Sequence, residues 1–563
     1  MTQPWWKTSV VYQVYPRSFA DSNGDGIGDL PGLIDRLDHI ATLGADVVWV
    51  SPFYPSPQAD NGYDISDYQG VDPMFGTLAD VDRLVRELHA RGMRLVIDIV
   101  ANHTSDEHPW FVESRSSRAS PKRDWYWWRP PRAGMPLGAP GAEPNDWHSW
   151  FTGPAWEPDE RTGEYYLHVF DRRQPDLNWE NPQVREAVHA MLRWWLERGV
   201  DGFRFDVINL VSKHLEPDGT GYFVDGPRIH EFLQELHERV WAGRETALLT
   251  VGETPGANVE QARRYTDPAR REVDMVFQFE HMHVDHGPGG RCDVRPLDLV
   301  ELKRVMARWQ EGLAEVGWNA LYWGNHDQPR PVSRYGSDDP AYRADSAKAL
   351  ATVLHLHRGT PYVYQGEELG MTNFPFSSLD QLDDVETRRW AQAALGRGMP
   401  VADVLAAVNA RSRDHARTPV QWDAGASAGF TTGTPWLPVN PNHIEVNAAA
   451  QVGEPGSVFA HFQRLIRLRR EWPVVVDGDF ALVLADHPTV YAFLRRLGDE
   501  QLLVAANLAS HAVDVDLPGV WEGTQVLLAS GPSNAGMPIG HLGPWEARIH
   551  WQSERPVPTA RRA

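Results

Sequence analysis

The chain has 563 residues, a formal net charge of −22, 42% hydrophobic and 23% charged residues, and 24 tryptophans, which is typical of a soluble globular protein too long for one compact core. Such acidity argues against a nucleic-acid or acidic-membrane partner, and the single cysteine, Cys292, excludes an intrachain disulfide. Because the N-terminus lacks a continuous apolar stretch and no run reaches the ~18 residues of a membrane span, we expect a cytoplasmic protein.

Several apolar, strand-like runs end in polar residues along the chain. Helical patterns lie between some of them, at 78–92 and 181–199. Strands alternating with helices predict a parallel sheet, and strands that are apolar almost throughout are buried on both faces. We therefore predict an α/β fold, a (β/α)8 TIM barrel with its active site at the carboxyl ends of the strands. The runs are SVVYQVYPRSF (9–19), ADVVWVSPF (45–53), MRLVIDIVANH (93–103), VDGFRFDV (200–207), LLTVGE (248–253), ALYWGNHD (320–327) and TPYVYQGEE (360–368).

Two regions break this alternation. The first, after the third run, is rich in Trp, Pro, Gly and Arg and shows little helical period. Near the C-terminus, short strand-like runs joined by turns predict a small antiparallel β-domain. The predicted division is a barrel over 1–103 and 177–480, an inserted subdomain B over 104–176, and a C-terminal β-domain over 481–563.

Three carboxylates stand at predicted strand ends, and basic side chains accompany them. Any one such acid is typical of a helix cap or a structural salt bridge, but three on one barrel rim indicate chemistry. The acids are Asp206, Glu253 and Asp327, and the basic residues are Arg204, His103 and His326.

Glycoside hydrolysis requires such a set. One carboxylate attacks the anomeric carbon, a carboxylic acid protonates the leaving oxygen, and a further acid can stabilise the positive charge of the transition state. Arg204 lies two residues before Asp206 on one strand, so both side chains point to the same side. Arg204 is therefore expected to keep Asp206 ionised and oriented.

Four segments, in this order, resemble the signature segments of the α-amylase superfamily: VIDIVANHTS (96–105), GFRFDVIN (202–209), TVGETPG (250–256) and GNHDQPR (324–330). The likeness is greatest to the oligo-1,6-glucosidase branch. It covers nearly the whole chain through VVYQVYPRSFADSNGDGIGDLPG (10–32), NGYDISDY (61–68), FQFEHM (277–282), TPYVYQGEELGMTN (360–373) and RTPVQWD (417–423).

The resemblance assigns roles to these residues. It implies that Asp206 is the nucleophile, Glu253 the acid/base and Asp327 the transition-state stabiliser. The residues implied to hold the glucose at the cleavage site are Arg204, His103 and His326.

A second group is implied to grip the non-reducing glucose. It consists of Asp64 and Tyr63, from NGYD, and Arg417, from RTPVQWD. A pair of Asp64 and Arg417 across the far end of the sugar would restrict the enzyme to releasing single glucose units, as an exo-acting retaining α-glucosidase does.

The linkage depends on the leaving-group side of the site. Val207 follows the nucleophile, and in this branch Val at that place accompanies α-1,6 preference, whereas Ala or Thr accompanies α-1,4. Gln278 and Glu280 resemble the leaving-group side, where an acid at Glu280 would repel a phosphate. We expect hydrolysis of isomaltose and short isomalto-oligosaccharides; the alternatives are an α-1,4-glucosidase, a sucrose-acting hydrolase or isomerase, and a trehalose-6-phosphate hydrolase.

The loop DSNGDGIGD (21–29) places oxygen donors at alternate positions, as an EF-hand loop begins. Gly32 stands at the twelfth position in place of the bidentate Glu, which rejects a true EF-hand. By resemblance to the branch we expect a structural Ca²⁺ site, with Mg²⁺ as the alternative ion. Its ligands would be Asp21, Asn23, Asp25, Ile27 and Asp29.

Two kinds of non-enzyme fit the sequence less well. A transporter heavy subunit with this fold needs a membrane span and usually loses the catalytic acids, and a starch-binding scaffold does not explain the three acids. The expected partner is therefore a small oligosaccharide. We expect no organic cofactor, no nucleic acid and no membrane partner, and a monomer or weak homo-oligomer.

Overall fold

The computed structural model describes residues 3–216, 220–517, 521, 524–531 and 539–553. Eight strands form one parallel sheet in the order β11-β10-β7-β3-β2-β1-β15-β14. A parallel bridge from Val276 to Asn319 joins its two outer strands, so the sheet closes and the predicted barrel is confirmed. The strands are β1 Val11–Val14, β2 Val47–Val50, β3 Arg94–Val100, β7 Gly202–Asp206, β10 Leu249–Glu253, β11 Met275–Phe277, β14 Ala320–Leu321 and β15 Thr360–Tyr364. The sequence runs missed only β11, whose three residues are too few to show a pattern.

Alternate residues of each barrel strand serve two different cores. On β2, Trp49 packs inside the barrel with residues of the neighbouring strands, whereas Val48 and Val50 pack outward against the helices. Both faces are therefore apolar, which explains the nearly continuous hydrophobic runs. On β7 the outward positions are Phe203 and Phe205, so the residues between and after them face the barrel interior.

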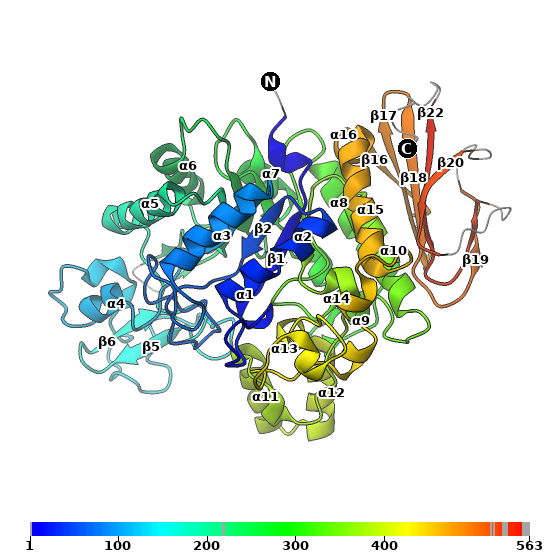
Figure 1. The fold of residues 1–563 in the computed structure, drawn as a ribbon. Coiled ribbons are helices and arrows are strands. Elements are labelled where there is room, and N and C mark those ends of the chain that lie inside the picture. Colours follow the sequence, from blue (N-terminus) through cyan, green and yellow to red (C-terminus); the bar gives the residue numbers. More distant parts are fainter. Residues whose placement is uncertain (1–2, 217–219, 518–520, 522–523, 532–538, 554–563) are drawn as a thin grey trace.

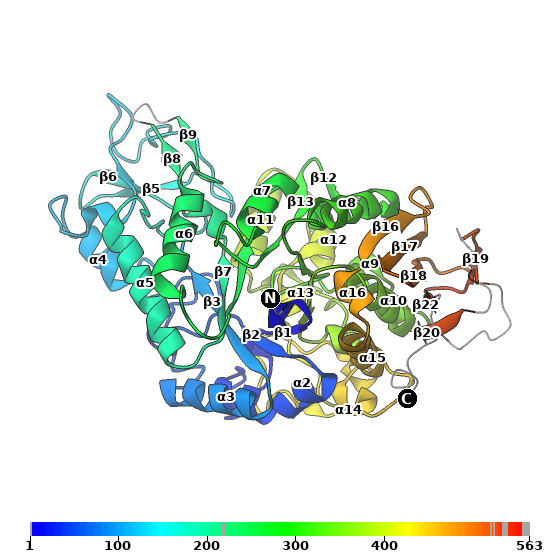
Figure 2. The ribbon, with the colours of Figure 1, turned by 90° about the horizontal axis from the view of Figure 1, so that it is seen from above.

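Helices surround the strands (Figures 1 and 2). The predicted pattern at 78–92 forms α3 (Leu78–Ala90), which begins at a capping box of Thr77 and Asp80. The pattern at 181–199 forms α5 (Pro182–Glu197), with Asn181 as its N-cap and proline at its first position. No helix of the described ranges is long and apolar enough to cross a membrane. The other long barrel helices are α6 Ile229–Val240, α8 Leu299–Gly312, α10 Arg343–His355 and α15 Val458–Glu471.

The segment predicted as an insertion leaves the barrel after β3. It contains α4 (Pro109–Ser114) and a three-stranded antiparallel sheet of β4 (Trp128–Arg129), β6 (Glu164–Leu167) and β5 (Trp156–Asp159). Isolated bridges from His103 to Asp176 and from Tyr126 to Leu177 tie its two ends together. The insertion thereby stands over the carboxyl end of the barrel next to β3 and β7.

The C-terminal part is an antiparallel sheet that lies at the other end of the molecule from the insertion (Figures 1 and 2). Its strands are β16 Asp479–Val483, β17 Val490–Leu497, β18 Glu500–Asn507, β22 Ala547–Ser553 and β20 Gln525–Ala529, and it begins two residues before the predicted boundary.

One lysine of the barrel fastens this sheet. Lys303 of α8 is fully buried, and its ammonium donates to the carbonyl oxygens of Leu484 (2.6 Å), His487 (2.7 Å) and Val490 (3.0 Å). These carbonyls belong to the turn between β16 and β17. Because three donors meet three acceptors, the buried ammonium and the turn satisfy each other.

Replacing Lys303 by Met is expected to destabilise the protein by about 2–4 kcal/mol, because three buried carbonyls lose a charged donor. Urea unfolding followed by circular dichroism measures the change. The neighbouring Arg304, which pairs with Asp486 at the surface at 2.8 Å, provides the control. Arg304→Ala should cost no more than about 1 kcal/mol, and equal losses for the two variants would contradict the role assigned to Lys303.

Candidate active site

Arg204 is the centre of the buried charge at the carboxyl end of the barrel. Its side chain is 1% exposed, and Nη1 donates to Asp98 at 2.9 Å and to Asp206 at 2.7 Å, while Nη2 donates to Glu253. The three acids come from the adjacent strands β3, β7 and β10, and Asp98 and Arg204 are direct partners in the parallel register. One guanidinium therefore holds the predicted nucleophile and the predicted acid/base close together.

Three carboxylates share one cation at this place. Burial raises the pKa of Asp206 and of Asp98 above the usual range, and Arg204 opposes the rise. Glu253 and Asp98 add to the rise for Asp206, because like charges close together disfavour ionisation, so Arg204 offsets less of the effect of burial than the sequence predicted. Two carboxyl groups held on one guanidinium fit the close spacing that a retaining glycosidase needs, about 5–5.5 Å.

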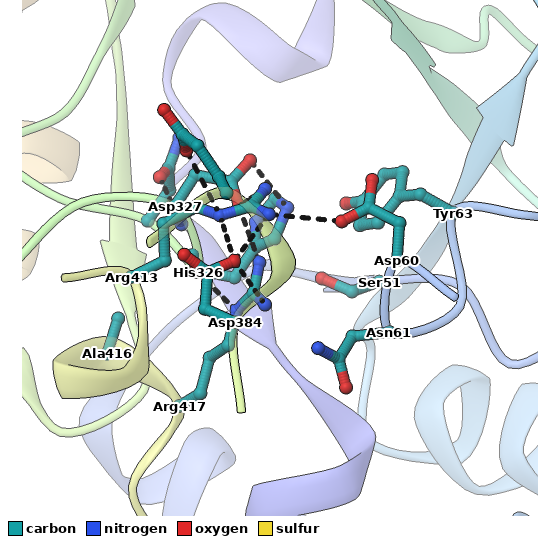
Figure 3. Close-up of polar contacts among 12 residues, drawn as sticks. Ser51, Asp60, Asn61, Tyr63, His326, Asp327, Asp384, Arg413, Ala416 and Arg417 are labelled. Carbon is teal, nitrogen blue, oxygen red and sulfur yellow. Dashed lines mark hydrogen bonds and ion pairs between the residues drawn. The ribbon is translucent and has the colours of Figure 1, made fainter. Parts of the chain in front are cut away.

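Asp327 stands in a different electrostatic setting (Figure 3). Its Oδ1 accepts from Arg417 at 2.8 Å and lies 3.2 Å from Nη1 of Arg413, and its Oδ2 lies 3.2 Å from the imidazole of His326. Burial alone would raise the pKa of Asp327, but His326, Arg413 and Arg417 outweigh it and hold the pKa well below the usual range. The carboxylate is thus ionised and suited to stabilise positive charge.

An ion pair of Asp60 and Arg413 faces the cavity beside Asp327, where the sequence had predicted a pair of Asp64 and Arg417. Asp60 Oδ1 lies 3.1 Å from Nη2 of Arg413, as Figure 3 shows, and Asp60 Oδ2 accepts from Gln174 at 3.1 Å. Both members of the pair line the cavity that Asp206, Glu253 and Asp327 also line. Burial raises the pKa of Asp60 to about 7, with Arg413 and Arg417 lowering it.

Asp64 and Arg417, which were predicted to grip the sugar, do not line the cavity. Asp64 is fully enclosed, and its carboxylate accepts from the Ser56 hydroxyl and from the amides of residues 59 and 60 at 2.8–3.0 Å. It therefore shapes the loop that presents Asp60. Arg417 is also fully buried and supports Asp327 from outside the cavity.

The remaining residues predicted to hold the glucose divide into two groups. His103 and Tyr63 line the cavity, and burial lowers the pKa of His103 to about 3, so its imidazole is neutral. His326 and Arg204 are buried and do not line it. His326 stacks on Tyr63 with ring centroids 5.1 Å apart and so fixes the wall from behind.

Val207 follows Asp206 and approaches Glu253, the predicted nucleophile and the predicted acid/base. It lines the cavity, its backbone N–H points at the Glu253 carboxylate at 3.3 Å, and its φ is +35°. A β-branched residue in this left-handed region is strained. The strain turns the chain sharply after β7, so the side chain of Val207 enters the cavity directly beside that of Asp206.

Gln278 and Glu280, which were predicted on the leaving-group side, lie outside the cavity lining. Gln278 turns to His281 at 2.6 Å, and Glu280 accepts from Arg308 and Trp309 on α8. Glu280 begins the short 3-10 turn Glu280–Met282, which rotates its side chain outward. The cavity wall here comes instead from Phe279, Met282, His283 and His286.

The cavity has a volume of about 520 Å³, within the range of small-ligand sites. Sequence reasoning missed part of its lining. Two of the three residues between Asp60 and Asp64, Asn61 and Gly62, have positive φ. No sequence rule predicts which of the two acids such a turn directs into the cavity. Proximity to RTPVQWD was the only signal for Arg413. The other missed wall residues are Trp150, Phe151, Phe170, Val224, Pro255, Gly256, Gly290, Arg291, Gln328 and Glu386.

The loop predicted to bind Ca²⁺ folds as a series of turns closed by its own side chains. Asp21 accepts from the amides of residues 23, 24 and 26, and Asp25 accepts from the amide of Ile27 at 2.8 Å. Asp29 caps α1 (Leu30–Asp35) with Oδ1, and its Oδ2 accepts from the amide and the hydroxyl of Ser22 in the loop. Within the described ranges no group of three or more His, Cys, Asp or Glu side chains is arranged to hold a metal ion. The loop offers the oxygen donors that Ca²⁺ prefers, although both carboxylate oxygens of Asp29 already accept hydrogen bonds.

Comparison with known proteins gives the family. Residues 13–478 match the model of the alpha amylase catalytic domain, and residues 480–548 match that of the maltogenic amylase C-terminal domain. The chain is 50% identical to an oligo-1,6-glucosidase of Halalkalibacterium halodurans, over 98% of this chain and 99% of the relative.

Two solved structures share the fold over 98% of this chain. A variant of the trehalose-6-phosphate hydrolase of Bacillus licheniformis, in complex with PNG, superposes with a TM-score of 0.92 at 43% identity, covering 98% of this chain and 100% of that one. An isomaltulose synthase of Klebsiella superposes with a TM-score of 0.92 at 40% identity and the same coverage. With the barrel and its rim of acids, these matches show that the chain is a glycoside hydrolase of the α-amylase family.

Proposed function

We propose that the protein is a retaining exo-α-glucosidase that releases glucose from the non-reducing end of isomaltose and short isomalto-oligosaccharides. The observation that carries this proposal is the arrangement of Asp206 and Glu253 on one guanidinium, with Val207 projecting into the cavity between them. Full-length identity of 50% to an oligo-1,6-glucosidase supports it.

The proposed reaction has two steps. Asp206 attacks the anomeric carbon while Glu253 gives its proton to the glycosidic oxygen, so the leaving sugar departs neutral and a glucosyl ester forms on Asp206. Glu253, now a carboxylate, then takes a proton from a water molecule that attacks the same carbon and releases Asp206. Asp327 stabilises the oxocarbenium-like charge in both steps.

Exo action follows from the pair of Asp60 and Arg413. Asp60 lies in the loop after β2, and Arg413 directly precedes α13 (Asp414–Arg417). Their charged groups meet beside Asp327, with Oδ1 of Asp60 3.1 Å from Nη2 of Arg413. Its carboxylate and guanidinium can bind the hydroxyls of a terminal glucose, as charged groups do strongly. A longer chain on that side would have to break this ion pair.

Preference for the α-1,6 bond follows from Val207. Its branched side chain narrows the cavity where the leaving group stands. An α-1,6 bond places an additional CH₂ between the two rings, so the leaving ring lies further from the nucleophile and tolerates the narrowing. An α-1,4 bond holds the leaving ring directly against Val207.

A phosphorylated disaccharide fits this cavity poorly. The lining contains the five acids Asp60, Asp206, Glu253, Asp327 and Glu386. The two lining arginines are engaged, since Arg413 contacts several carboxylates and Arg291 contacts Glu386 at 3.3 Å and the backbone carbonyl of Asp327. Phosphate recognition needs available cationic groups.

Initial rates of glucose release from isomaltose, maltose, sucrose and trehalose 6-phosphate test the proposal. We expect isomaltose to be the best of the four, with product separation showing no isomers of sucrose. The variant Asp206→Ala should lose at least about 1,000-fold in kcat, as expected for a nucleophile. A higher rate on maltose or sucrose would overturn the linkage assignment, and normal turnover by Asp206→Ala would overturn the nucleophile.

Asp60 and Asp64 provide a matched pair of variants. Asp60→Asn should lower kcat/KM for isomaltose about 10- to 150-fold with little change in melting temperature, because one charged hydrogen bond to the sugar is lost. Asp64→Asn should instead lower the melting temperature, since Asn cannot accept all three hydrogen bonds, and should change kcat/KM only a few-fold. The reverse pattern would restore the prediction from sequence.

Calcium binding at the loop 21–29 is a further proposal, tested by thermal unfolding. Excess Ca²⁺ should stabilise the EDTA-treated protein, by about 2.7 kcal/mol at a hundredfold excess over Kd. Asp25→Asn should abolish the response. Asp67→Asn is the matched control, because the Asp67 carboxylate closes a similar turn by accepting from the amide two residues on, at 2.9 Å. An unchanged melting temperature with Ca²⁺ would exclude the site.

A further inference from the structure

Trp150 presents an uncovered aromatic surface to the catalytic cavity. It lines the cavity and is 40% exposed. Within the described ranges it is the only tryptophan among the exposed large hydrophobic residues. Because burying an indole contributes more than burying most side chains, leaving this much of it open indicates a surface kept for a ligand.

The insertion holds this ring rigidly by its edge and its backbone. Trp150 N donates to the Val169 carbonyl at 2.9 Å, and the ring meets Phe170 edge to face, with centroids 5.3 Å apart at 85°. The hydroxyl of Ser149 donates to the Phe170 carbonyl at 2.6 Å. Phe223 is a second aromatic neighbour of the ring, with centroids 6.2 Å apart at 55°. The ring is therefore fixed before any ligand arrives, which reduces the entropy lost on binding.

The contacts of Trp150 place it at the outer rim of the cavity. His103, at 1% exposure, lies 5.1 Å from Phe170, at 8%, and Phe170 in turn contacts Trp150. Exposure thus rises along this path from the site of cleavage to solvent.

The other neighbour of Trp150 belongs to the wall beside the acid/base. Phe223 packs in one apolar cluster with Val207 and Val224, and the latter two line the cavity together with Glu253. A leaving group departs on the side of the residue that protonates it. Through Phe223 the ring of Trp150 is therefore connected to the leaving-group wall.

We propose that Trp150 forms an outer sugar-binding subsite that stacks on the second glucose unit of the leaving group. The apolar C–H face of a pyranose matches an aromatic face, and stacking tolerates the rotational freedom that each α-1,6 linkage adds. Isomaltose has one leaving-group unit and is too short to occupy the subsite, whereas isomaltotriose and longer chains reach it. This inference rests on the proposed function.

The test is the dependence of kcat/KM on chain length, measured with isomaltose, isomaltotriose and isomaltotetraose. In Trp150→Ala we expect the ratio of kcat/KM for isomaltotriose to that for isomaltose to fall about 3- to 10-fold, mainly through KM. Trp150→Phe, which keeps a flat ring, should recover most of the ratio. Tyr222→Ala removes another exposed aromatic ring, one that lies outside the cavity lining, and should leave the ratio unchanged.

Calorimetric binding to the turnover-deficient Glu253→Gln variant gives a second measurement. Isomaltotriose should bind more tightly than isomaltose, and adding Trp150→Ala should remove that difference. An equal loss for all chain lengths, or the same change in Tyr222→Ala, would overturn the subsite. Failure of the proposed function would look different, because the wild-type protein would then release no glucose from isomaltose or from the two longer substrates.

Discussion

The burial of Arg204 is the constraint on which the site depends. A guanidinium at 1% exposure needs anionic partners, and it can find three only where adjacent strands deliver acids at matching heights. Strands β3, β7 and β10 do so because they are parallel, in register and closed into a barrel. The interior that makes the charge costly also makes each contact strong, since few water molecules compete there. Catalytic geometry and fold stability are therefore coupled at one side chain.

Two clusters on the same rim differ in how their carboxylates are compensated. Around Arg204 one guanidinium contacts three carboxylates, and burial raises the pKa of Asp98 and of Asp206. Around Asp327 the pKa is held well below the usual range by His326, Arg413 and Arg417, although both arginines also contact Asp384. Acid catalysis and stabilisation of positive charge need contrasting environments of this kind.

The sequence predicted the strand ends better than the loops between them. Asp206 and Glu253 end their strands, and a strand fixes the direction of its side chains. Asp327 lies in the loop beyond β14 and was indicated by the segment GNHDQPR. The sequence pointed to Asp64 and missed Asp60 because two residues of positive φ lie between them. The backbone turns there, so the alternation of side chains seen in a strand does not apply. Arg413 and Arg417 both reach Asp327, and only packing decides which of them also faces the cavity. The side chain of Glu280 differs from its predicted position because a short 3-10 turn begins at this residue.

The difference between strands and loops also explains why the fold alone does not determine the substrate. A trehalose-6-phosphate hydrolase and an isomaltulose synthase both superpose on this chain with a TM-score of 0.92, so the barrel and its rim of acids cannot distinguish their substrates. What can differ is the wall around the leaving group, to which the insertion, the strained turn at Val207 and the loop carrying Arg291 contribute. In this chain that wall is apolar on the side of Trp150 and Val224, and its one cation, Arg291, is engaged by Glu386. A neutral sugar can enter without desolvating an unpaired charge, and a phosphate cannot. Selection among relatives therefore depends on a few side chains held by loops, while the chemistry depends on those held by strands.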